Sequence, residues 1–98
     1  MKSIVKSLNV EERLLATHIA DNQNFEAACM SGDADLIRTI VLSEMDKAQL
    51  NTKGANKLKD DIFSLLKEQA KVSVQTGEHI LFFVWNARLS GTGFAVVK

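Results

Sequence analysis

The chain contains no proline and a single cysteine, Cys29, among its 98 residues. Without proline the strongest helix breaker is missing, which favours helices joined by glycine, asparagine and aspartate turns. One cysteine cannot form an internal disulfide, so a small domain stapled by disulfides is excluded. The first 15 residues also lack the uninterrupted apolar segment of a secretory signal. We therefore expect an intracellular, cytoplasmic protein.

Net charge and long apolar segments are missing as well. Twelve basic and twelve acidic side chains cancel, which removes any overall attraction to nucleic acid or to an anionic membrane. A zero net charge does not exclude a local basic patch. The longest apolar run, residues 80–85, is far shorter than the roughly 20 residues of a membrane-spanning helix. The content of hydrophobic residues is 46% and that of charged residues is 24%, and both are ordinary for a globular protein. We expect one domain over residues 1–98.

The first two-thirds of the chain has the chemistry of helix starts and stops. Asn9 and Glu12 have the spacing of a capping box at the start of a first helix. Asn24 and Asp33 stand where they can cap a second and a third helix, and Gly32 can end the second. These signals predict short helices separated by tight turns.

The third and fourth predicted helices have clear apolar faces. Apolar residues recur at helical spacing between residues 36 and 45, and again between 55 and 70, after the break at residues 51–54. In the fourth helix Leu58, Ile62, Leu65 and Leu66 lie on one face. Together with the first two, these segments predict about four short helices within residues 3–70.

From residue 71 the periodicity changes from helical to alternating. Val72 and Val74 alternate with polar residues, Thr76–Gly77 can form a turn, and the run over residues 80–85 is rich in aromatic and β-branched side chains. We interpret residues 71–98 as a three-stranded antiparallel β-meander, which makes the fold α+β. The alternative is an all-α fold with a fifth helix over residues 77–90.

The apolar run also suggests a function. In a meander Ile80, Phe82 and Val84 share one face of the sheet, and helices on the other face would leave them exposed. An exposed apolar patch of this kind marks an interface. We expect a small regulatory protein that works by protein–protein contact, as a homodimer or with another protein. The alternative is that helices cover both faces of the sheet, so that residues 80–85 belong to the hydrophobic core.

Chemistry-bearing residues are scarce and scattered. The two histidines, His18 and His79, have no second metal ligand at a recognisable spacing, and Cys29 stands alone in an alanine-rich segment. No acid–base or nucleophile constellation can be assembled from them. The sequence therefore predicts no enzyme, no metal and no cofactor.

Nucleic-acid binding is the rival hypothesis, although it is not favoured. Short helices followed by a β-ribbon have the element order of a winged helix. In that arrangement the helix over residues 55–70 would enter the major groove, and the ribbon would form the wing. The candidate contacts are Lys53, Asn56, Lys57 and Lys59 at the helix start and Arg88 at the wing.

Overall fold

The structure is a computed structural model that describes the backbone of residues 2–97 and the side chains of residues 10–89. Over this range the chain forms five helices and no strand, so the predicted α+β fold is wrong and the all-α alternative is right. The helices are α1 (Lys2–Asp21), α2 (Phe25–Ser31), α3 (Ala34–Ala48), α4 (Lys53–Leu66) and α5 (Val74–Val97).

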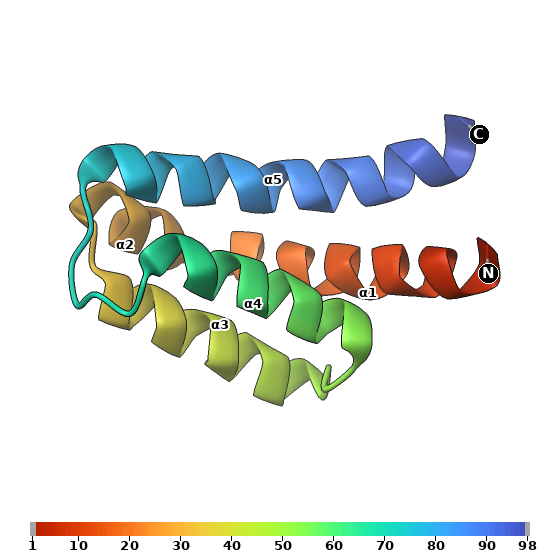
Figure 1. Cartoon of the computed structure of the whole chain (residues 1–98), viewed down its shortest axis with the longest axis horizontal. Helices are drawn as coiled ribbons and strands as arrows, with labels where there is room; N and C mark the ends of the chain where they lie inside the picture. Colours follow the sequence, from red (N-terminus) through yellow and green to blue (C-terminus); the bar gives the residue numbers. More distant parts are fainter. Residues whose placement is uncertain (1, 98) are drawn as a thin grey trace.

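Helix α1 is the central element, because it contacts each of the other four helices. Helix α5 runs antiparallel along one side of α1, so the first and last helices of the chain lie together (Figure 1). Helices α3 and α4 form a hairpin on the opposite side, and the short α2 packs against the first turns of α5. Helix α5 therefore lies at an outer edge of the molecule.

The predicted β-meander is replaced by α5, which covers residues 74–97 without a break. Its start is set by Ser73, whose Oγ accepts a hydrogen bond from the Thr76 N–H at 3.1 Å, the geometry of a helix N-cap. Gly77 is inside the helix, where it donates to the Ser73 carbonyl at 3.0 Å, and it makes no turn. The single β-like contact in the described residues is an isolated bridge between Asp33 and Lys71.

The helix ends test the capping predictions. Gly32 ends α2 in the left-handed conformation, with φ of 70°, and Asp33 caps α3 by accepting from the Leu36 N–H, so both predictions are confirmed. Asn24 makes no side-chain cap. Asn9 lies within α1, which begins seven residues earlier, at Lys2, so no helix starts there. The Asn9 side chain lies outside the described residues.

Helix α4 begins at Lys53 and ends at Leu66, earlier at both ends than predicted. The Thr52 hydroxyl caps it by accepting from the Ala55 N–H at 3.3 Å. It ends because Lys67 adopts a left-handed conformation with φ of 53°. Of the predicted apolar face, Leu58, Ile62 and Leu66 are fully buried, and Leu65 is half-buried.

The core is formed by apolar side chains from every helix. Between α1, α2 and α5 it includes Leu15, Ile19, Phe25, Ile80 and Val84, all buried. The remaining large buried side chains are Cys29, Ile37, Ile40, Val41, Met45, Leu58, Ile62, Leu66 and Leu81.

None of the helices, within the residues searched, is both long and apolar enough to cross a membrane.

Candidate functional site

Helix α5 is apolar on nearly all sides although only one side of it faces the core. Ile80, Leu81 and Val84 are buried against the neighbouring helices. A helix that is hydrophobic all round is normally buried all round. Because α5 lies at the edge of the molecule, part of its apolar surface faces outward instead (Figure 1).

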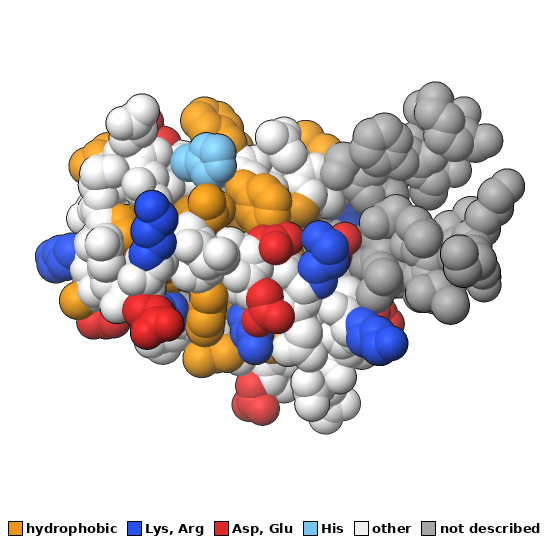
Figure 2. Space-filling view, viewed as in Figure 1, with side chains coloured by type: hydrophobic (Ala, Val, Ile, Leu, Met, Phe, Trp, Pro, Cys, Tyr) orange, Lys and Arg blue, Asp and Glu red, His pale blue; other side chains and the backbone are white. Residues whose placement is uncertain are grey.

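Three outward apolar residues of α5 lie in one row, which we call the outer stripe: Phe82, Trp85 and Leu89. Their spacing of three and then four residues places them on the same helical face. The exposed fraction is 57% for Phe82 and 61% for Leu89, and Trp85 is half-buried. Hydrophobic side chains are visible over this part of the molecule in the space-filling view (Figure 2). The outer stripe is thus an apolar surface available to another molecule.

Two aromatic rings of the outer stripe contact each other. The rings of Phe82 and Trp85 meet edge to face, with centroids 6.0 Å apart and planes at 84°. This is a favourable aromatic arrangement. Aromatic side chains are frequent at the centres of protein interfaces.

The structure separates the three residues that the sequence placed together in an interface. Phe82 is exposed, but Ile80 and Val84 are completely buried in the core. Alternate residues share a face in a strand, whereas in a helix they point about 200° apart. Trp85 and Leu89 were missed for the same reason. Their spacing from Phe82 would have identified them had the helical alternative been taken.

Two charged residues on α5 flank the outer stripe. Glu78 lies one turn before Phe82 on the same face, and Arg88 immediately precedes Leu89. Neither side chain has a hydrogen bond or ion pair with the described residues. The Nε atom of Arg88 is buried without a hydrogen-bond partner there. Glu78 therefore lies at the N-terminal end of the outer stripe, whereas Arg88 shares a helical face with the buried Leu81 and Val84.

Two of the three lysines considered for nucleic-acid binding, Lys57 and Lys59, are already paired with carboxylates. Lys57 Nζ lies 3.2 Å from Asp61 and 3.6 Å from Glu12. The hydrogen bond and charge of Asp61, aided by the charge of Glu12, raise the pKa of Lys57. Lys59 Nζ lies 3.4 Å from Asp60 and 5.9 Å from the ring centre of Phe63. Positive charge at this end of α4 is largely neutralised.

The other candidates for nucleic-acid contact do not complete such a site. The Asn56 side chain donates to Asn51 Oδ1 and to the Thr52 carbonyl, so its amide is engaged in the turn before α4. Lys53 is exposed at the first position of the helix. Arg88 belongs to α5, because the ribbon that would have formed a wing does not exist within residues 2–97. The geometry gives the winged-helix hypothesis no support.

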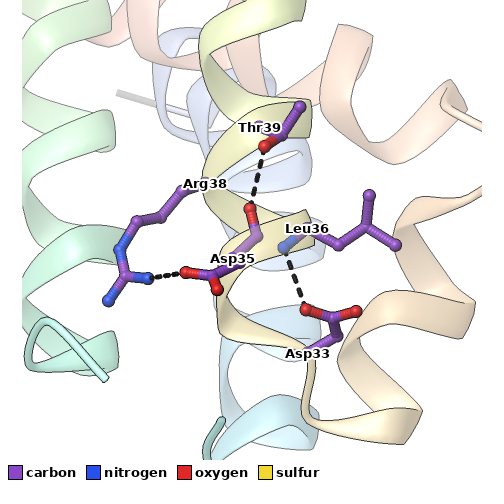
Figure 3. A network of polar contacts seen from close by, with 5 residues as sticks. All are labelled: Asp33, Asp35, Leu36, Arg38 and Thr39. Atoms are coloured by element: carbon purple, nitrogen blue, oxygen red, sulfur yellow. Dashed lines mark hydrogen bonds and ion pairs between the residues drawn. The ribbon is translucent and has the colours of Figure 1, made fainter. Parts of the chain in front are cut away.

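The densest polar cluster in the first half of the chain is structural. At the start of α3, Asp33 Oδ1 accepts from the Leu36 N–H at 3.1 Å, and Arg38 pairs with Asp35 at 3.0 Å (Figure 3). The Thr39 hydroxyl donates to the Asp35 carbonyl at 2.9 Å. All three contacts join residues three or four apart on one helix. They stabilise the first turns of α3 and form no binding site.

Reactive side chains do not converge anywhere in the described residues. Cys29 is buried, and burial, with a smaller contribution from the Glu26 charge, raises the pKa of its thiol to about 12. A thiol with that pKa is not a nucleophile at neutral pH. His18 and His79 are exposed on different helices. In the residues searched, no group of three or more His, Cys, Asp or Glu side chains could hold a metal ion.

The described chemistry thus offers one candidate surface, the outer stripe of α5, and no reactive site. A function for this chain has to be inferred from the geometry of that surface. Comparisons with protein-family models, with curated proteins and with solved structures found no match.

Proposed function

We propose that this chain is a non-enzymatic protein-interaction module that self-associates through the outer stripe of α5. The observation that carries the proposal is the exposure of Phe82 and Leu89 on either side of Trp85, in one row on an edge helix. A reducing compartment such as the cytoplasm suits the proposal, because the sole cysteine is a buried free thiol.

The expected gain on association comes from removing apolar surface from water. Fully burying an exposed Leu or Phe side chain stabilises a complex by about 1.5–3 kcal/mol, and partial exposure scales this down. Three side chains can therefore offset only part of the entropy lost when two molecules associate. We expect a weak dimer that dissociates on dilution, in the class of small, transient interfaces.

The test is the solution mass measured by light scattering across a dilution series. The monomer has a mass of 10.8 kDa, so the concentrated protein should approach twice that value. Phe82→Glu should abolish the rise in mass, because it places a charge in the middle of the contact. Its circular dichroism should match that of the original protein, since Phe82 contributes little to the core.

Leu42→Glu is the matched control. Leu42 is 49% exposed, comparable to Phe82, but it lies on α3, which makes no contact with α5. This variant should dimerise like the unmodified protein. A monomer at every concentration, or equal loss of dimer in both variants, would rule out self-association through the outer stripe.

A further inference from the structure

The connection between α4 and α5 begins with three exposed residues, Lys67, Glu68 and Gln69. Lysine, glutamate and glutamine are all strong helix formers, so this stretch of sequence favours a continuation of α4. The structure instead ends α4 at Leu66 and turns the chain at Lys67 and Glu68, with φ of 53° and 55°. Both residues therefore have the left-handed backbone that glycine adopts more readily.

The turn is held by contacts that come after it in the chain. The Ala34 N–H donates to the Ala70 carbonyl at 3.0 Å, and the Val72 N–H donates to the Gly32 carbonyl at 2.9 Å. These two hydrogen bonds fix the second half of the connection against the turn between α2 and α3. From there α5 enters its place on α1 and α2. Local preference and tertiary packing thus disagree at residues 67–69.

The surface that α5 covers fits an α5 helix, whichever copy of the chain supplies it. Helix α5 packs mainly on α1 and α2, and less on α4, the helix that precedes it (Figure 1). It buries Ile80 and Val84 there, and Gly77 lies against the carbonyl oxygen of Cys29. A chain whose α4 continues as a helix carries its α5 away from this surface. Exchange of an identical element between two copies re-forms the contacts of the monomer, so it is a low-cost route to a dimer.

We infer that residues 67–69 are a hinge, and that two copies of this chain can exchange α5, so that each α5 packs on α1 and α2 of the other copy. The two main-chain hydrogen bonds of the connection then join one copy to the other. The hinge adopts helical backbone, which removes the left-handed turn, while the core of each half is unchanged. This assembly does not use the outer stripe, which stays on the surface of both halves.

The exchanged dimer forms when chains fold together at high concentration. In dilute solution each chain closes on its own α5, because that helix is tethered nearby. A folded monomer exchanges slowly, since α5 has to leave the core first. Concentrating the folded protein therefore tests the outer stripe, whereas refolding from denaturant at high protein concentration tests the hinge.

The experiment is refolding of the Phe82→Glu variant from urea at high and at low protein concentration, followed by dilution and light scattering. Phe82→Glu removes the contact of the outer stripe and leaves the buried side chains of α5 in place. After refolding at high concentration only, we expect a species of twice 10.8 kDa that persists on dilution. Adding Lys67→Gly/Glu68→Gly should lower the dimer fraction about tenfold or more, because glycine accepts the left-handed turn and disfavours the helix.

Gln49→Gly is the matched control. Gln49, after α3, is also exposed and left-handed, with φ of 55°, but it has the same conformation in the monomer and in the exchanged dimer. This substitution should leave the dimer fraction unchanged. The unmodified chain should give the same persistent dimer, since contacts through the outer stripe dissociate on dilution.

The exchange is overturned by a monomer after concentrated refolding, by a dimer that dissociates at once on dilution, or by equal effects of the glycine pair and Gln49→Gly. None of these results affects the proposal for the outer stripe, which is tested on folded protein. Conversely, a folded protein that stays monomeric when it is concentrated overturns the outer-stripe dimer and leaves the exchange to be decided by refolding.

Discussion

Gly77 of α5 lies directly against the carbonyl oxygen of Cys29 in α2. A Cβ atom built on Gly77 would overlap that oxygen and lie 2.8 Å from the carbonyl carbon. The first turn of α5 thus crosses the last turn of α2 with backbone against backbone. This contact fixes where α5 begins its path along the edge of the molecule.

Gly77→Ala should therefore destabilise the protein by about 2–3 kcal/mol, the range expected when a side chain is forced into a packed site. The obstacle is main chain and cannot rotate away. Gln75→Ala is the control, because Gln75 is exposed in the same turn and alanine favours the helix. Urea denaturation should show a large fall in midpoint for the first variant only, and equal midpoints would contradict the crossing.

Two consecutive residues after α4, Lys67 and Glu68, adopt left-handed conformations with φ of 53° and 55°. This conformation costs a residue with a Cβ roughly 1–2 kcal/mol, and glycine avoids that cost. Lys67→Gly or Glu68→Gly should raise the free energy of unfolding by about 0.5–1 kcal/mol, after the extra entropy of glycine in the unfolded chain is subtracted.

Gln69→Gly is the comparison for this turn. Gln69 is also exposed, but its φ is not positive, so glycine there brings only the entropic loss. Gln69→Gly should lower the free energy of unfolding, whereas Lys67→Gly and Glu68→Gly should each raise it. Three variants that all destabilise would show that the left-handed turn is not strained.

The Cys29 thiol should be unreactive in the folded protein. Because burial raises its pKa to about 12, almost no thiolate forms at pH 8, and the sulfur is out of reach of solvent. Labelling with a coloured disulfide reagent should be slow in buffer and immediate in denaturant. Rapid labelling in buffer would mean that α2 opens readily.

The same pKa predicts a dependence of stability on pH. The folded value, about 12, lies above the ordinary value of 9.0, so the neutral thiol is preferred in the folded state. The contribution of the buried neutral thiol to the stability of the folded protein is fully present below pH 9 and is lost as the pH rises toward 12. Denaturation midpoints at pH 8 and pH 10.5 should differ more for the original protein than for Cys29→Ala.

Glu11 joins the central helix to the start of α4. Its Oε1 accepts from the Gly54 N–H at 3.0 Å, which places a carboxylate at the positive end of that helix. Glu11→Ala should lower the free energy of unfolding by about 1 kcal/mol. Glu11→Gln keeps an acceptor oxygen and should lose less. If Glu11→Ala is as stable as the original protein, the contact contributes nothing.

The parts of the fold that the sequence predicts are those with local causes. Gly32 and Asp33 act within a few residues of themselves, so the end of α2 and the start of α3 could be predicted without knowing the tertiary structure. The buried face of α4 follows from its helical spacing in the same way. Leu36, by contrast, fits the apolar spacing of α3 and is nevertheless exposed, while its neighbour Ile37 in the same turn is completely buried.

The sequence favours strands over the helical alternative for α5 because the apolar residues of this helix lie on opposite faces. Ile80 and Val84 pack in the core, while Phe82 and Leu89 face outward. Because both sides of the helix carry apolar residues, the sequence shows no apolar stripe at helical spacing. The aromatic and β-branched content then favours a strand. The packing of α1 and α2 decides the conformation, and it also decides which of these residues can form the outer stripe.

The pairing of α1 with α5 has a consequence for the order of folding. The central helix lies against the last of the five described helices, and these contacts span most of the sequence. Helices α2, α3 and α4 can form locally while the chain is still emerging, but the side of α1 that packs on α5 stays uncovered until α5 is complete. Closure of this long-range pair is therefore the step that we expect to limit the folding rate.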